Sequence, residues 1–208
     1  MKYVIDHDLH IHSYLSACSK DPEQTPERIL RYAKETGLKT ICLTDHFWDD
    51  GVDGASEWYA QQNYQHLAVA RPLPQEDGIR FLFGCETELD RNLTLGLSPE
   101  KYDLFDFLVI PTTHMHFRGF TLSEDAAGVT PRAVAWVNRL DAVLHMELPF
   151  HKVGLAHLTS THLAPSREER IAVLHAIPEN DMRRLFTRAA MLGVGIELNG
   201  SDMKFSDA

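Results

Sequence analysis

Short apolar runs along the chain alternate with longer stretches in which apolar residues recur at every third or fourth position. The short runs are rich in β-branched and aromatic residues and therefore predict strands, whereas the longer spacing predicts amphipathic helices. The predicted strands span residues 3–10, 40–44, 81–86, 105–111, 153–157 and 194–198. Because strands that alternate with helices build parallel sheets, the pattern predicts an α/β fold made of β/α units.

The residues between the first two predicted strands carry the start and stop signals of a helix. Thr25 is a typical N-cap residue, Pro26 suits the first helical position, and Gly37 suits the end. Further helices are predicted at residues 131–146, 167–175 and 179–192. The segment 49–77 lacks the periodicity of a strand and is expected to form a long loop that contains a helix.

The first predicted strand leads into the sequence Asp8-Leu9-His10-Ile11-His12. Side chains alternate between the two faces of a strand, so the two histidines project side by side and Asp8 shares their face. Imidazole is a common ligand for zinc, iron and manganese, and a carboxylate such as Asp8 can hold the second ring nitrogen. A polar edge strand with solvent-facing histidines explains this stretch equally well.

Metal-binding residue types recur where the predicted strands end. These ends carry His10 and His12, His46, Glu86, His114, His157 and Glu197. In a β/α barrel the carboxyl ends of all parallel strands converge on one face, where the active sites of such barrels are built. We therefore expect a shared polynuclear metal site whose ligands come from separate strands.

Composition limits the class of protein. The 208 residues suit one domain, and no apolar run approaches the length of a membrane span. The first residues lack the apolar core of a signal peptide, so a soluble cytoplasmic protein is expected. Cys18, Cys42 and Cys85 form no Cys-x-x-Cys pair, which favours reduced thiols over a disulfide framework.

The net charge of −10 argues against a nucleic-acid backbone as the main partner, since proteins that bind it usually carry basic patches. Bound cations can invert the local field of an acidic chain, so chemistry on an anionic phosphate stays open when metals are present. Neither a membrane nor a nucleic acid is therefore expected as the partner.

Taken together, the strand ends resemble a known family. The segments that carry the resemblance are His10-Ile11-His12, Thr44-Asp45-His46, Gly84-Cys85-Glu86, His114 and Ala156-His157. In this order they are similar to the PHP (polymerase and histidinol phosphatase) superfamily of metal-dependent phosphoesterases. The resemblance implies an α/β fold of the distorted (β/α)7 TIM-like barrel type, which binds two or three divalent ions of Zn, Fe or Mn.

The resemblance also implies a ligand set. The implied ligands are His10, His12, His46, Glu86, His114 and His157. Glu86 would bridge two metals. Many members carry a further histidine six residues after the second histidine of the His-x-His motif, and Cys18 stands at that position here. A thiolate also binds zinc or iron, so Cys18 is included among the expected ligands.

One family feature does not follow His157 in this sequence. The family closes its site with an Asp-x-His on the last strand, and the sequence ends at Ser206-Asp207-Ala208 without one. Six strands would leave a barrel open with an exposed edge. We therefore expect residues 1–208 to be a single PHP-type domain that is C-terminally incomplete, with the last β/α unit missing. The alternative is a site that lacks its last carboxylate and histidine.

The residues after His114 supply candidates for catalysis. A site histidine, either His157 or His116, would protonate the leaving group as general acid beside the metal-holding Glu86. Arg118 could fork onto phosphate oxygens, although a surface ion pair explains it equally well. The other histidines that we considered are expected to be structural or solvent-facing, namely His7, His66, His145, His151 and His175.

Three functions compete. The first is a phosphatase that acts on a small phosphorylated substrate. Histidinol phosphate is the best single guess, because stand-alone family members of this size resemble the histidinol phosphatases, and its ammonium group would also suit an acidic pocket. The second is a phosphodiesterase or nucleotidase, for which Trp48, Trp58 and Tyr59 would offer stacking surfaces. The third is a non-catalytic module that binds metal or a partner. An amidohydrolase also has a His-x-His strand, but the Thr-Asp-His and Gly-x-Glu strand ends do not belong to that pattern.

Overall fold

The computed structural model describes residues 4–199, so Tyr3 and the end of the chain at Ala208 lie outside the described residues. The described residues divide into two compact units. Unit one comprises residues 4–87 and 96–109, and unit two comprises residues 88–95 and 110–199. Each unit contains parallel strands and helices, which confirms the predicted α/β class.

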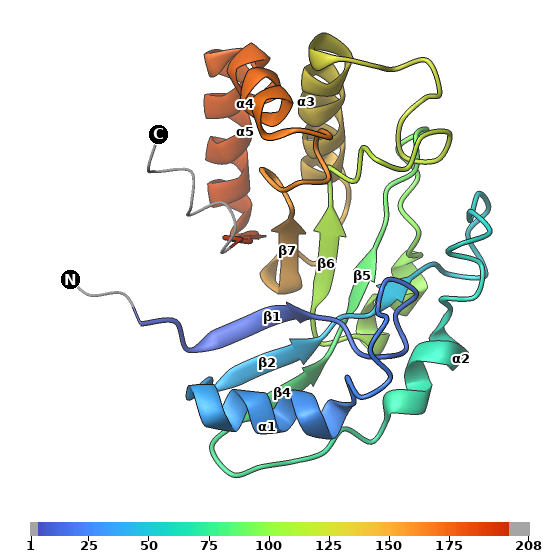
Figure 1. The fold of residues 1–208 in the computed structure, drawn as a ribbon, viewed down its shortest axis with the longest axis vertical. Coiled ribbons are helices and arrows are strands. Elements are labelled where there is room, and N and C mark those ends of the chain that lie inside the picture. Colours follow the sequence, from blue (N-terminus) through green and yellow to red (C-terminus); the bar gives the residue numbers. More distant parts are fainter. Residues whose placement is uncertain (1–3, 200–208) are drawn as a thin grey trace. The chain divides into compact units, whose positions relative to one another are not determined.

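A three-stranded parallel sheet forms the first part of unit one. Its strands are β1 (His7–Ile11), β2 (Thr40–Leu43) and β4 (Arg80–Phe83), in the order β1-β2-β4. Helix α1 (Pro26–Thr36) runs beside this sheet (Figure 1). The predicted caps are confirmed: the Thr25 side chain accepts the Arg28 backbone N–H, and Gly37 ends the helix in the left-handed region at φ 78°.

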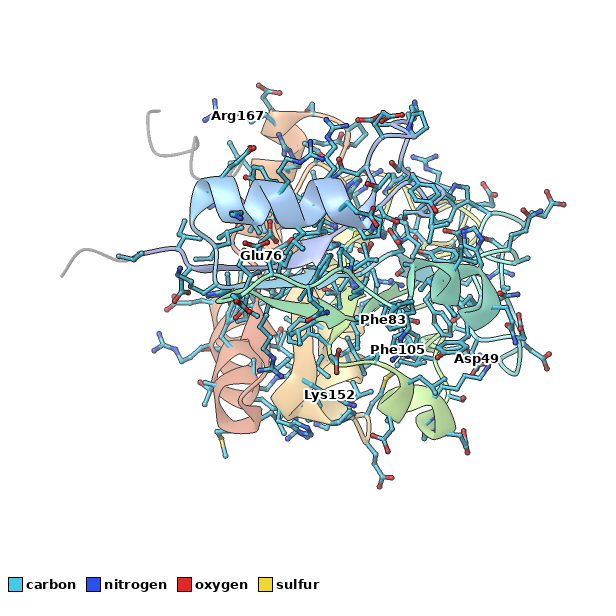
Figure 2. All side chains as sticks on the ribbon, turned by 90° about the horizontal axis from the view of Figure 1, so that it is seen from below. Asp49, Glu76, Phe83, Phe105, Lys152 and Arg167 are labelled. Atoms are coloured by element: carbon cyan, nitrogen blue, oxygen red, sulfur yellow. The ribbon has the colours of Figure 1, made fainter. Side chains whose placement is uncertain are left out.

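The second set of strands in unit one is β3 (His46–Phe47), β5 (Cys85–Thr87) and the start of β6 (Leu108–Pro111). His46 is the register partner of Glu86, so two candidate ligands stand side by side on neighbouring strands. The rings of Phe83 in β4 and Phe105, which precedes β6, are stacked with their centroids 5.6 Å apart, and both are buried (Figure 2).

The prediction of one strand over residues 81–86 is wrong, because the chain passes from β4 to β5 at Gly84. A Cβ at Gly84 would lie 2.4 Å from the Phe107 carbonyl oxygen and 2.8 Å from the Cys42 sulfur. Only glycine permits this close approach. The predicted strand 105–111 is likewise shortened to β6, and a 3₁₀ helix (Pro99–Leu104) precedes it.

Between β3 and β4 the structure confirms a long loop with a helix. The helix α2 (Tyr64–Leu67) continues as a 3₁₀ turn (Ala68–Ala70). Cys42 and Cys85 are buried, as expected for core cysteines, whereas Cys18 is exposed.

Unit two combines the end of β6 with β7 (Val153–Ala156) and β8 (Gly195–Ile196) in the order β6-β7-β8. A short 3₁₀ turn (Phe150–Lys152) precedes β7. Its helices are α3 (Val129–His145), α4 (Arg167–Ala176) and α5 (Glu179–Leu192), which match the predicted helices to within about two residues. Helix α3 packs against both α4 and α5. The strand predicted at 194–198 is shorter than expected.

The barrel itself is not confirmed by the strand pairing. Among residues 4–199 no strand pair closes a ring, so the seven-unit barrel and the single PHP-type domain stay predictions. No helix in the described part of the chain is both long and apolar enough to span a membrane.

Candidate metal centre

The buried carboxylate of Glu86 is the centre of a ligand group in unit one. Its side chain is fully buried, and its Oε2 lies 3.4 Å from His10 Nε2, 3.1 Å from His12 Nε2 and 3.0 Å from His46 Nδ1. The four residues come from the neighbourhoods of β1, β3 and β5, as the sequence predicted. The donor atoms of His10, His12 and Glu86 all lie within 4.8 Å of one another, which suits one divalent ion.

Electrostatics favours a cation in this group. Burial raises the pKa of Glu86, but the charges of His46 and His10 outweigh burial and hold that pKa well below its usual value. Burial lowers the pKa of His46, but the Glu86 carboxylate reverses the shift and raises it to about 10. The ionised carboxylate thus retains a proton on an adjacent imidazole, and a divalent ion competes with such a proton for the same donors. The residues present therefore fit a metal.

Cys18 joins a second group in unit one. The donor atoms of His12, Cys18 and His46 lie within 4.8 Å of one another. Ser16 links the three residues: its hydroxyl lies 3.1 Å from His12 Nδ1 and 3.4 Å from the Cys18 sulfur, and it accepts the His46 backbone N–H at 3.3 Å. Burial raises the pKa of Cys18, but hydrogen bonds from His46 and Ser16 outweigh it and lower that pKa, which favours the thiolate.

Two aspartates near these groups act on the backbone. Asp45 is buried and accepts both the backbone N–H and the hydroxyl of Ser13 at 2.6 Å, which fixes the loop between His12 and Cys18. Asp8 accepts the backbone N–H of His10 at 3.2 Å. The expectation that Asp8 holds a ring nitrogen is therefore not what the structure shows, because its carboxylate bonds to the backbone instead.

Unit two holds a third group, made of imidazoles. The donor atoms of His114, His157 and His162 lie within 4.8 Å of one another. His114 follows β6, His157 follows β7 with a positive φ of 63°, and His162 lies in the loop before α4. The first two were expected from the sequence, and the third was not.

The Glu88 carboxylate contacts the His114 imidazole at its Nδ1 nitrogen. Its Oε2 lies 2.7 Å from His114 Nδ1, and its Oε1 accepts a hydrogen bond from Arg139 Nη2 at 3.0 Å. Arg139 is buried in α3 and also donates to the carbonyl oxygens of Leu89, Asp90, Thr112 and Thr121. A carboxylate that binds one nitrogen of a histidine leaves the other nitrogen for a metal.

A comparison with protein families decides the identity. A model of the PHP domain matches residues 8–170. The chain belongs to the PHP domain family. This PHP protein is accordingly a metal-dependent phosphatase of the hydrolase class, as the donor groups around Glu86 and His114 suggest.

One solved structure supports the fold, and a second is reported beside it. A HisK protein of Listeria monocytogenes, described as a candidate histidinol phosphatase, has a TM-score of 0.54 at 11% identity and covers 91% of this PHP protein and 92% of its own chain. The histidinol phosphate phosphatase of Lactococcus lactis, solved with zinc, L-histidinol and phosphate, has a TM-score of 0.44 at 18% identity, covering 93% and 85% of the two chains. A search of curated proteins found no match.

The candidates beyond His114 lie at the surface of this PHP protein. His116 and Arg118 are both exposed. The His116 ring lies 4.5 Å from the His162 ring, close to the imidazole group. Among the described residues no ion pair is found for the Arg118 guanidinium, so the alternative of a surface ion pair has no support.

The remaining histidines agree with their structural assignment and belong to none of the three groups. His66 contacts the Leu15 carbonyl oxygen at 2.7 Å through Nε2. The exposed ones are His7, His145, His151 and His175.

Sequence reasoning missed His162, Glu88 and Arg139. His162 stands five residues after His157 in a polar turn, a spacing that could have drawn attention. Glu88 follows Glu86 by two positions and so repeats its place in the alternation of a strand. Arg139 lies on the apolar stripe of α3 between Trp136 and Val143, where a charged residue requires a buried partner.

Proposed function

We propose that this PHP protein hydrolyses a small phosphomonoester and that histidinol phosphate is the best single candidate. The observation that carries the proposal is the fully buried Glu86 carboxylate, which has three imidazoles within 3.4 Å. A group of this kind is expensive to bury unless a cation is bound to it. The imidazole group of unit two is a second set of donors that suits a divalent ion.

The proposed ligands are those of the sequence, assigned to two units. In unit one they are His10, His12, Cys18, His46 and Glu86, and in unit two they are His114 and His157. We propose two or three divalent ions of Zn, Fe or Mn, because imidazole, carboxylate and thiolate donors suit these metals. When bound, such ions lower the pKa of a water and neutralise charge on phosphoryl oxygens.

The chain's own residues have three further roles in this proposal. Glu86 fixes the imidazoles of His10, His12 and His46 around one point. His116 is the favoured general acid because it is exposed and so can reach a leaving oxygen, while His157 is the alternative. Arg118 would bind non-bridging phosphate oxygens as a fork of N–H donors.

A cavity in unit one supports a small substrate with a cationic group. It has a volume of about 360 Å³ and lies between β1 and α1, where Asp8, His10, His12 and Arg28 contribute to its lining. The Arg28 guanidinium forms an ion pair with Asp21 at 2.6 Å and not with Asp8. The Asp8 carboxylate can therefore contact an ammonium group in this cavity. The primary amine of histidinol phosphate would suit this position.

A nucleotide-directed phosphodiesterase is the second candidate, favoured by one observation. The Trp58 ring lies 4.7 Å from the His46 ring and is partly exposed, so a base could stack on it. Trp48 and Tyr59 are buried in the core and offer no such surface. The aromatic support for this function is therefore limited to one residue.

The experiment is a substrate panel on the full chain at fixed Mn or Zn and near-neutral pH. We expect kcat/KM to fall in the order histidinol phosphate, sugar phosphate, nucleoside monophosphate, generic diester. Asp8→Asn should lower kcat/KM for histidinol phosphate but leave the value for a sugar phosphate nearly unchanged. A panel led by the diester would replace the monoesterase with the second candidate, and equal effects of Asp8→Asn on both substrates would remove the ammonium contact.

A further inference from the structure

We propose that His162 is a metal ligand, which completes with His114 and His157 a three-imidazole site for a zinc-class divalent ion. The inference rests on the proposed phosphoesterase function and assigns one position of its metal site. None of the sequence patterns pointed to His162, and the family resemblance gave no counterpart for it. The site lies wholly within unit two.

The three rings surround a common point. The centroid of the His162 ring lies 4.9 Å from that of His114 and 5.2 Å from that of His157, while His114 and His157 are 5.0 Å apart. Each ring has a donor nitrogen within 4.8 Å of a donor nitrogen on the other two. His162 is inclined at 81° to His114 and at 68° to His157, so its ring is stacked on neither of them.

The Glu88 carboxylate fixes the orientation of the His114 ring, independently of His162. His114 Nδ1 faces Glu88 at 2.7 Å, so the second nitrogen, Nε2, is turned away from that carboxylate. His157 Nδ1 lies 3.3 Å from Glu197 Oε2. Metal-binding histidines commonly hold a carboxylate or carbonyl with the nitrogen that does not bind the metal. The buried Arg139 in turn fixes Glu88, so this orientation is built into the core of unit two.

The backbone between β7 and α4 is shaped to bring His157 and His162 together. His157 adopts a positive φ of 63°, which is uncommon for a residue other than glycine and concentrates at functional sites. Its N–H donates to Glu197 at 2.9 Å, and its carbonyl accepts from Thr113 Oγ1 and from the Ser160 N–H. The Ser160 hydroxyl then accepts the His162 N–H at 3.3 Å. A compact turn thus presents both imidazoles to one side.

The donor set selects the class of ion and its use. Three imidazoles suit Zn²⁺ and Co²⁺ better than Mg²⁺ or Ca²⁺, which prefer oxygen ligands. Three protein ligands are also the number that catalytic zinc sites use, with one position left for water or substrate. Neutral imidazoles leave the double positive charge of the ion in place, so this position would attract a phosphate oxygen.

The first test compares zinc content after dialysis of the full chain against a zinc buffer of limiting free concentration. His162→Gln should carry one zinc ion fewer per chain than the wild type. His175→Gln changes an exposed histidine of α4 in the same unit and should match the wild type. Equal zinc content in His162→Gln and the wild type, across the zinc range, would overturn the proposal.

A second test can be used if His162→Gln folds poorly. Cys18→Ser/His162→Cys places a thiol at position 162 and removes the exposed one, leaving only the buried Cys42 and Cys85. With Co²⁺ this double variant should show a thiolate-to-cobalt charge-transfer band in the near ultraviolet, and Cys18→Ser/His175→Cys should not. Absence of the band in the first variant, with cobalt bound, would contradict contact between residue 162 and the metal.

The tests separate this inference from the proposed function. A wild-type chain that binds no zinc and cleaves no phosphomonoester would remove both proposals. A wild-type chain that binds zinc and is active, but whose zinc content and cobalt spectra do not respond at position 162, would remove the role of His162 alone.

Discussion

The two units gather metal-type ligands in opposite ways. In unit one the carboxylate of Glu86 is itself surrounded by imidazoles, so the donors carry negative charge. In unit two the donors are imidazoles, and the Glu88 carboxylate contacts the Nδ1 nitrogen of His114. The charge of an ion in unit one would be largely neutralised by its donors, whereas an ion in unit two would keep its charge. We therefore expect unit one to hold its ion more tightly than unit two.

The largest expected effect comes from removing the charge of Glu86. Glu86→Gln keeps the size of the side chain but leaves three imidazoles without their carboxylate, so metal affinity and activity should fall by more than about 100-fold. Metal content and kcat/KM measure both. His175→Gln is the matched control. Comparable losses of metal and activity in the two variants would show that Glu86 is not needed for metal binding.

Glu88→Gln should have a smaller effect, because Glu88 acts on the metal through His114. The amide still contacts His114 but no longer fixes its ring through a charge, so zinc affinity in unit two should fall by about 10- to 100-fold. Competition with a coloured zinc chelator would resolve the weak and the tight ions separately. We expect Glu88→Gln to affect the weakly bound ion. A loss of the tightly bound ion instead would show that unit two, not unit one, holds its ion more tightly.

Cys18 allows a test of donor type within unit one. Cys18→Ser should weaken zinc binding on the order of 10-fold, since the imidazoles and Glu86 remain. Cys18→His, which supplies the residue that many family members carry there, should retain most of the affinity. If Cys18→Ser bound zinc as tightly as the wild type, Cys18 would not be a ligand.

The smallest expected effect on metal binding is at Asp49, a buried carboxylate that stabilises the fold and is not among the proposed metal ligands. Asp49, which Figure 2 labels, is buried like Glu86. Unlike Glu86, it accepts hydrogen bonds from the Gly51 N–H at 2.8 Å, from the Ser98 hydroxyl and from Lys101. Asp49→Asn should lower the free energy of unfolding by about 1–3 kcal/mol and leave metal content unchanged. A loss of metal in Asp49→Asn would show that the two acids are not separate in function.

The same variant should respond to pH in a defined direction. Burial raises the pKa of Asp49, but Lys101 and Ser98 outweigh burial and lower it. A carboxyl whose pKa is lower in the folded state stabilises the fold above its unfolded pKa of about 3.9 and loses that contribution as pH falls through the folded value. Acid should therefore destabilise the wild type more than Asp49→Asn, which denaturant unfolding at pH 7 and pH 3 would measure. Parallel pH profiles would contradict the assignment.

The strand-end logic explains how much of this site the sequence could predict. His10, His46 and Glu86 lie in the short strands β1, β3 and β5, and His12 directly follows β1. Local alternation is enough to put these side chains on one edge. His162 and Arg139 could not be found this way, because their positions depend on a loop turn and on helix packing that bring distant segments together. The division of β4 from β5 at Gly84 had the same origin, since it depends on the approach of Phe107.

Metal-specific anomalous scattering from crystals of the full chain grown with zinc tests the central claim most directly. The account predicts one strong peak within bonding distance of Glu86 and its imidazoles, and a separate peak among His114, His157 and His162. Zinc at Glu86 alone would leave unit two without its proposed ion. Crystals of zinc-treated, folded protein with no peak at either group would contradict the account as a whole.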